Sequence, residues 1–268
     1  MRRHFVHFLW GSLLAILGLV FVFFISVWNG WIGYMPDMDE LSNPIDKFAS
    51  QVYSSDQQLI GTWNADNNNR VAIDYNGLSP HLVHALVATE DERFYEHSGV
   101  DFIALGRAVV KRGVMGQASA GGGSTITQQL AKQLFSEKAH STVERLLQKP
   151  IEWIIAVKLE RYFTKEEILA MYFNYFDFLH NAVGIKRAAN VYFNKEPRKL
   201  TVTESAMLVG LCKNPSMFNP LRHPERCLQR RNVVLMQMVK SGYVTKDEYK
   251  ELSQRPLGLH FTRSKPVS

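Results

Sequence analysis

A run of 21 consecutive uncharged residues, Phe8–Trp28, constrains this chain more than any other feature. At about 1.5 Å per helical residue, the run is long enough to cross a hydrocarbon core of about 30 Å. A cleaved signal peptide is the alternative, but its apolar region is usually shorter and ends in a small-x-small cleavage site. Here Trp28, Trp31 and Tyr34 close and follow the run. The run therefore predicts an uncleaved transmembrane helix.

The charges on either side of this run orient the predicted helix. Arg2 and Arg3 precede it, and three acidic residues follow it within positions 37–40. Basic residues flank the cytoplasmic end of a membrane span, so the N-terminus is expected in the cytoplasm. We expect a cytoplasmic tail over residues 1–7, a single anchor over 8–28, and the remaining residues on the extracytoplasmic (periplasmic) side of the cell (inner) membrane.

The composition fits a globular domain and argues against a nucleic-acid-binding protein. The 268 residues are 46% hydrophobic and 21% charged, and the net charge is +6. The basic residues are spread along the chain, with no Arg-rich or aromatic-interleaved motif. Beside a bilayer, a basic domain is better suited to anionic lipid or phosphate.

The two cysteines, Cys212 and Cys227, leave two interpretations open. They could form a disulfide in an oxidising compartment, and two thiols buried in helices fit equally well. No CxxC or paired-His spacing predicts a metal-binding cluster.

Short β-prone runs separated by turn residues precede position 80. They are Gln51–Ser54, Leu59–Trp63 and Val71–Tyr75. We therefore predict a stalk with short strands over residues 29–80.

Helical signals dominate from position 81 onward. Apolar residues recur at helical spacing, and three Thr residues are each followed three positions later by Glu, the signature of a capping box. These pairs are Thr164 with Glu167, Thr201 with Glu204 and Thr245 with Glu248. We predict a mainly α domain over residues 81–253 and a C-terminal tail or linker over 254–268.

The first candidate for chemistry is the triplet Glu90-Asp91-Glu92, which follows a helix predicted over His81–Thr89. A carboxylate there meets the negative end of the helix dipole and like-charged neighbours, and both disfavour its ionised form. Such a carboxyl suits a general base that takes a proton near neutrality. A solvated helix end is the alternative explanation for any acidic triplet.

The second candidate is GGGSTITQQLAKQL at residues 121–134, where a glycine run meets the start of a helix. Ser124 or Thr125 is the expected N-cap, and free backbone amides at a helix start attract anions. Gln128 and Lys132 lie four residues apart and share a face, with Gln129 beside them. The segment therefore predicts a phosphate site, although a capped surface helix would have the same pattern.

The third candidate is QKPIEWIIAVKLER, in which Pro150 suits the first turn of a helix and Glu152 follows it. A carboxylate near a helix N-terminus is favoured by the dipole, so Glu152 is expected to stay ionised. Its alternative role is to stabilise its own helix.

Five segments, in this order, closely resemble the successive motifs of glycosyltransferase family 51, the peptidoglycan transglycosylases. They are ATEDERFYEHSGVD, GGGSTITQQLAKQL, QKPIEWIIAVKLER, TKEEILAMYFN and VGIKRAANVYF. The resemblance covers about Pro36 to Leu252, and GSTITQQL preceded by ED-x-x-F-x-x-H-x-G is its most specific part. It implies a mainly α fold with a lysozyme-like head and a small membrane-associated jaw. The jaw would be Phe102–Met115, which carries Lys111 and Arg112.

The resemblance also implies a reaction and its partners. The growing lipid-diphosphate glycan is transferred to the 4-hydroxyl of lipid II with inversion, which extends a β-1,4-linked strand and releases undecaprenyl diphosphate. The implied partners are lipid II, lipid-linked glycan, the bilayer and other cell-wall synthesis proteins, with no nucleic acid and no organic cofactor.

The family's functional residues map onto matching positions here. Glu90 resembles the base that deprotonates the acceptor, and Glu152 resembles a second carboxylate that positions the diphosphate directly or through Mg²⁺ or Mn²⁺. The residues that resemble the diphosphate and donor site are Ser124, Thr125, Gln128, Gln129, Lys132 and Lys149.

The sequence departs from the family pattern around Lys149. Gln148 stands where the family usually has Arg, and Ile151 stands where a basic residue is common. Arg145 is a candidate to supply the missing phosphate-facing charge.

Other functions remain as alternatives. Many family members carry a transpeptidase domain, but no Ser-x-x-Lys occurs here, and Lys240-Ser241-Gly242 is interpreted as a helix stop. The sequence fits a monofunctional protein or the front of a longer one. A lytic enzyme that cleaves glycan and a non-catalytic cell-wall scaffold are the two rival functions.

Overall fold

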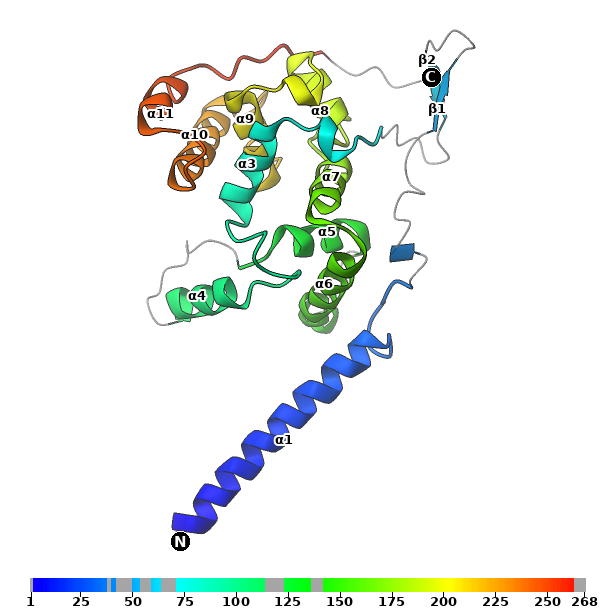
Figure 1. Cartoon of the computed structure of the whole chain (residues 1–268), viewed down its shortest axis with the longest axis vertical. Helices are drawn as coiled ribbons and strands as arrows, with labels where there is room; N and C mark the ends of the chain where they lie inside the picture. Colours follow the sequence, from blue (N-terminus) through cyan, green and yellow to red (C-terminus); the bar gives the residue numbers. More distant parts are fainter. Residues whose placement is uncertain are drawn as a thin grey trace.

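The structure, a computed structural model, describes residues 2–37, 40–41, 50–53, 59–63, 71–113, 123–135 and 142–262. Over these residues the chain is mainly α-helical, as predicted (Figure 1). Its helices are α1 (Arg2–Trp28), α3 (Pro80–Glu90), α4 (Phe102–Gly113), α5 (Ile126–Phe135), α6 (Thr142–Tyr162), α7 (Lys165–Tyr175), α8 (Ile185–Phe193), α9 (Val202–Cys212), α10 (Pro224–Lys240) and α11 (Lys246–Leu252). The short 3-10 helices are η2 (Tyr75–Gly77) and η3 (Pro197–Lys199), and the strands are β1 (Ser50–Tyr53) and β2 (Leu59–Trp63).

Helix α1 is long and apolar enough to cross a membrane. Its segment Arg3–Trp28 has a hydropathy of 2.6, and its most apolar stretch is not buried against the rest of the chain. Figure 1 shows α1 projecting away from the other helices. Residues 2–7, which we assigned to a tail, continue the same helix.

The end of α1 contacts α6 through an aromatic ring. The Trp28 ring centroid lies 5.1 Å from Nζ of Lys158 and 5.3 Å from Cζ of Arg161. Both distances are in the range of cation–π attraction. The contact therefore joins the proposed anchor to the C-terminal half of α6.

The predicted stalk contains two of its three expected strands. β1 and β2 pair antiparallel, with Ser50 opposite Trp63. The third prediction, Val71–Tyr75, is wrong: residues 71–74 form no strand and Tyr75 begins η2. Asn174 explains the difference, because its amide accepts from the Ile73 N–H at 3.2 Å and donates to the Ile73 carbonyl at 2.8 Å. A side chain thus satisfies the backbone groups that a neighbouring strand would pair.

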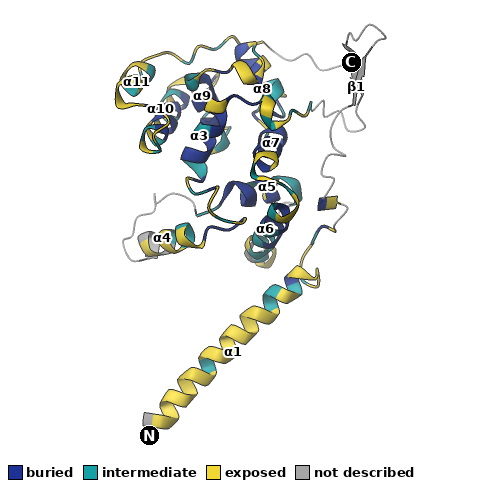
Figure 2. Cartoon of the chain, in the orientation of Figure 1, coloured by how far each residue is buried: buried dark blue, intermediate teal, exposed yellow. Residues whose placement is uncertain are grey.

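The core of the head lies between α3, α5, α7, α9 and α10. Buried residues concentrate on the faces that these helices turn toward one another (Figure 2). The largest fully buried side chains include Leu82, Leu86, Phe94, Ile126, Leu130, Tyr172, Phe173 and Tyr192. Full burial of one such side chain stabilises the fold by about 1.5–3 kcal/mol. Helix α3 packs on α9 and α10, and α5 packs on α6 and α7.

The predicted capping boxes and the predicted helix stop are confirmed. All three Thr/Glu pairs form reciprocal capping boxes, at the starts of α7, α9 and α11. Helix α10 ends at Lys240, and Gly242 follows with φ of +77°, as expected for a helix stop.

The predicted start of α6 is wrong. The helix begins at Thr142, so Pro150 lies inside it and Glu152 is far from its N-terminus. The residues before Pro150 are good helix formers, and a helix tolerates an interior proline when packing supports it. The dipole argument for Glu152 therefore fails.

Helix α4 exposes apolar side chains. Phe102, Ile103 and Val110 are 71%, 60% and 54% exposed. The helix lies in the segment for which the resemblance implies a jaw, while residues 114–122 and the side chains of Lys111 and Arg112 lie outside the description.

Arg231 on α10 holds the chain that follows α11. Its side chain is completely buried, and its guanidinium donates to the carbonyls of Leu252, Ser253, Arg255 and Pro256 at 2.7–3.3 Å. A buried cation surrounded by accepting carbonyls is well satisfied, so Arg231 fastens this segment to the core.

We expect Arg231→Met to lower the free energy of unfolding by about 3 kcal/mol, because four carbonyls lose their donor. Thermal unfolding of the detergent-solubilised protein, followed by circular dichroism, measures the change. Arg226→Met, at an exposed position of the same helix, is the matched control. Equal unfolding midpoints for the two variants would contradict the role assigned to Arg231.

Candidate active site

Glu90 is the last residue of α3, where the sequence places it. Its Oε2 accepts from the Gln129 side-chain amide at 3.0 Å, and its Oε1 lies 3.4 Å from a guanidinium nitrogen of Arg230. The side chain is 13% exposed. Glu90 is therefore held on two sides, by α5 and by α10.

Asp91 connects the end of α3 to the start of α5. Its Oδ2 accepts from the Ile126 N–H at 3.0 Å, and both of its oxygens lie 3.0 Å from Nε2 of His97. A carboxylate at a helix N-terminus is favoured by the dipole and by the free amides. Sequence reasoning missed this contact, because it joins residues 35 positions apart.

Thr125 is the N-cap of α5, one of the two predicted candidates. Its hydroxyl accepts from the Gln128 N–H at 3.1 Å and donates to the Gly99 carbonyl at 2.6 Å. Oε1 of Gln128 accepts in return from the Thr125 N–H at 3.4 Å. Gln128, which is 2% exposed, thus completes the cap.

Gly99 allows the loop after Glu90 to approach α6 closely. It has φ of +92°, and a Cβ at this position would lie 2.8 Å from the Ala156 backbone. Only glycine fits both the conformation and the space.

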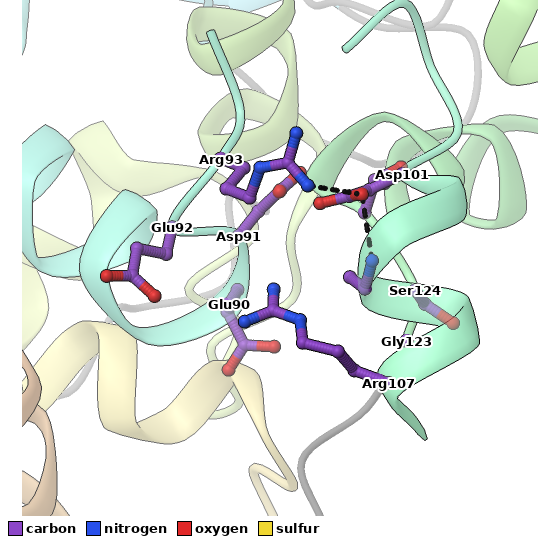
Figure 3. Close-up of a pocket in the computed structure, with 10 residues that line it drawn as sticks. Glu90, Asp91, Glu92, Arg93, Asp101, Arg107, Gly123 and Ser124 are labelled. Carbon is purple, nitrogen blue, oxygen red and sulfur yellow. Dashed lines mark hydrogen bonds and ion pairs between the residues drawn. The ribbon is translucent and has the colours of Figure 1, made fainter. Parts of the chain in front are cut away.

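An open pocket of about 110 Å³ brings the two motifs together. Its walls include Glu90 at the end of α3 and Gly123, Ser124 and Thr125 at the start of α5 (Figure 3). Arg107 extends from α4 toward Glu90 in the same view. The acid and the predicted phosphate segment therefore lie around one pocket.

Acidic side chains outnumber basic ones around this pocket. Four carboxylates and two guanidinium groups line it, namely Glu90, Asp91, Glu92, Asp101, Arg93 and Arg107. The acid-rich walls suit neutral hydroxyl groups better than a diphosphate. Cationic side chains that could face phosphate lie beyond Ser124.

Ser124, Lys149 and Glu152 form a second cluster next to the pocket. Nζ of Lys149 lies 3.4 Å from Oγ of Ser124 and 2.7 Å from Oε2 of Glu152. The Glu152 side chain is 3% exposed, whereas that of Lys149 is 53% exposed. A half-exposed lysine side chain therefore neutralises a buried carboxylate.

The described residues do not form a site for a resident divalent cation. Among them no group of three or more His, Cys, Asp or Glu side chains is arranged so that it could hold a metal ion, and the Glu152 carboxylate is paired with an ammonium. Mg²⁺ is bound through several oxygen ligands, so one paired carboxylate is insufficient by itself.

The remaining predicted site residues have different surroundings. Gln129 contacts Glu90, while Lys132 is exposed on α5, so Gln128, Gln129 and Lys132 do not converge on one point. Arg145 lies in α6, but its side chain is outside the description.

Tyr172 and Cys212 lie near Glu90. The Tyr172 hydroxyl donates to Oε1 of Gln129 at 3.1 Å, which orients the amide that binds Glu90. Burial raises the pKa of the Tyr172 hydroxyl, and the Cys212 thiol and Glu90 raise it further. Burial, followed by the charge of Glu90, raises the pKa of Cys212. Both cysteines are free thiols in helices, Cys227 buried and Cys212 half-buried, so the disulfide interpretation is wrong.

Comparisons with known proteins agree on one family. The family model described as "Transglycosylase" matches residues 56–239, more than half of the chain. Penicillin-binding protein 1A of Aquifex aeolicus is 39% identical over 248 residues, which cover 92% of this chain and 32% of that protein.

Two further relatives are also penicillin-binding proteins. Penicillin-binding protein 1A of Escherichia coli is 37% identical over 227 residues, covering 85% of this chain and 26% of that protein. Penicillin-binding protein 1F of Bacillus subtilis is 42% identical over 192 residues, covering 72% and 26%. The chain spans about a third or less of the length of these relatives.

We expect Cys212 and Cys227 to react slowly with iodoacetamide at pH 8 in the folded protein. The thiolate is the reactive species, and burial raises the pKa of Cys227 to about 12 and that of Cys212 upward as well. Mass spectrometry before and after unfolding in urea measures the labelling. Rapid modification of both thiols without urea would contradict this arrangement.

Proposed function

This chain belongs to the transglycosylase family, and from that premise we propose that it is a peptidoglycan glycosyltransferase that polymerises lipid II. The observation that carries the proposal is the shared pocket, in which Glu90 and the Ser124–Thr125 helix start meet. A glycosyl transfer needs a base at the acceptor and charge stabilisation at the leaving group. The two ends of this site offer those two functions.

Glu90 is the general base in this proposal. Its carboxylate takes the proton from the 4-hydroxyl of lipid II, and the oxygen attacks the anomeric carbon of the lipid-linked glycan. The bond from that carbon to the diphosphate breaks, and its electron pair leaves with undecaprenyl diphosphate. A single displacement inverts the anomeric centre and requires no nucleophilic side chain.

Ser124 and Lys149 serve the diphosphate end. The Lys149 side chain is half-exposed and its ammonium lies beside Oγ of Ser124, so a phosphate oxygen can bind to both groups. Positive charge placed where negative charge develops lowers the barrier to departure. Lys132 and Arg145 are proposed as further cations along the diphosphate and its lipid.

In the proposal, four further residues hold the base and the diphosphate-binding groups in place. They are Glu152, Thr125, Gln128 and Gln129. Glu152 fixes Lys149, the Thr125–Gln128 cap fixes the start of α5, and Gln129 orients Glu90. A divalent cation, Mg²⁺ or Mn²⁺, is proposed only as a companion of the substrate diphosphate. It would neutralise charge on the leaving group.

Two helices support a location at the cell membrane. Helix α1 has the length and hydropathy of a span, and α4, in the segment of the implied jaw, exposes apolar side chains. We propose a single-pass anchor with a cytoplasmic N-terminus and an extracytoplasmic head. The lipid-linked substrates would then reach the pocket without leaving the bilayer.

We expect Glu90→Gln to lower lipid II polymerisation by about 10²- to 10⁴-fold, the usual contribution of a general base. Purified protein in detergent is incubated with lipid II, and the glycan is resolved by gel electrophoresis. Glu166→Gln, at an exposed position on α7, is the matched control and should retain the wild-type rate.

Near-normal polymerisation by Glu90→Gln would remove Glu90 from the role of base. Shortening of finished glycan by the wild-type protein would favour a lytic enzyme, and inactivity on both substrates would favour a scaffold. The same assay with EDTA tests the cation: loss of rate that Mg²⁺ or Mn²⁺ restores would support it.

A further inference from the structure

Two neighbouring arginines on α10 have different surroundings. Arg231 donates to four backbone carbonyls, whereas a terminal nitrogen of Arg230 lies 3.4 Å from Oε1 of Glu90. The side chains of Arg230 and Glu90 are 14% and 13% exposed. Nε of Arg230 is buried and has no hydrogen-bond partner within the described part of the chain.

The space for Arg230 depends on α9 and the loop after it. A Cβ on Gly210 would lie 3.2 Å from Cγ of Arg230, so a larger residue would press on the arginine stem. The Phe218 ring centroid lies 5.8 Å from Cζ of Arg230 on another side. These contacts direct the guanidinium toward Glu90.

The ion pair between Arg230 and Glu90 is expected to contribute little to the stability of the fold. Burying an ion pair costs about as much desolvation free energy as the attraction returns, and an apolar side chain of similar volume often stabilises a protein as well. The unpaired Nε–H adds a further cost. The positive charge at Glu90 therefore needs a reason other than folding.

The surroundings of Glu90 give that reason. The charged and titratable groups around it are Asp91 and Glu92 at its own helix end, Arg107 from α4, Tyr172 from α7, Cys212 from α9 and Arg230 from α10. Tyr172 and Cys212 are neutral near pH 7, because burial raises the pKa of both. Asp91 and Glu92 add negative charge beside Glu90, and among the described side chains Arg230 is the cation within ion-pair distance of it.

We propose that Arg230 is a positioning residue that keeps the Glu90 carboxylate ionised and aimed into the pocket. This inference rests on the proposed role of Glu90 as base. Arg230 acts on Oε1 while the Gln129 amide acts on Oε2. Each carboxylate oxygen keeps a lone pair for the acceptor proton.

The test is the pH profile of lipid II polymerisation by the full chain in detergent. In Arg230→Met we expect the acid limb of kcat/KM to move up by about one pH unit or more, because the base loses its counter-charge. On the acidic side of the limb, each unit lowers the rate about tenfold. KM should change little, because Arg230 does not contact the substrate in this proposal.

Two matched variants accompany Arg230→Met. Arg230→Lys keeps the charge but shortens its reach, so we expect a lower kcat with the acid limb near its wild-type position. Arg226→Met removes an exposed charge from the same helix and should leave both the rate and the profile unchanged. Should Arg230→Met fail to fold in a thermal melt, Arg230→Gln replaces it with the same expected shift.

The outcomes separate this inference from the proposed function. If the wild-type protein polymerises lipid II and the neutral variants keep the wild-type acid limb, the role of Arg230 alone is overturned. This holds even if the unfolding midpoints of the neutral variants fall. Failure of the wild-type protein to polymerise lipid II at any pH would overturn the proposed function and this inference with it. A shifted limb in the neutral variants, with the Lys variant close to wild type, would support both.

Discussion

The geometry of the site depends on one buried carboxylate, that of Asp91. It accepts from the Ile126 N–H at the start of α5 and pairs with His97, while its own backbone ends α3. A buried carboxylate without these donors would be costly, so the junction resists separation. Glu90 precedes Asp91 and Thr125 precedes Ile126, so this single contact also sets the distance between Glu90 and the start of α5.

Features encoded by neighbouring residues could be predicted from the sequence. The three capping boxes, the glycine after α10 and the end of α3 at Glu90 each depend on residues within one helical turn. The start of α6 and the third strand of the stalk could not be predicted. Packing tolerates Pro150 inside α6, and the amide of Asn174, 101 positions from Ile73, takes the place of a strand partner.

Prediction of the candidate site from the sequence has the same limit. The sequence placed Glu90 and Thr125 at helix ends, where the structure has them, but it carried no signal for Gln129 and Arg230 as the residues that hold Glu90. Arg230 and Arg231 are adjacent in the chain, yet one faces Glu90 and the other the C-terminal segment. Their difference arises from the direction of each side chain on α10, and only tertiary packing decides which partner each one meets.

The contact of Trp28 with Lys158 and Arg161 links the end of α1 to the helix beside the pocket. A membrane thinner or thicker than the apolar length of a span changes the tilt of that span. Here the end of α1 is attached to α6, and α6 is the helix that carries Glu152 and Lys149. With α1 in a bilayer, as proposed, a change in its tilt would pass through this contact to α6 and so to the Lys149–Glu152 pair beside the pocket.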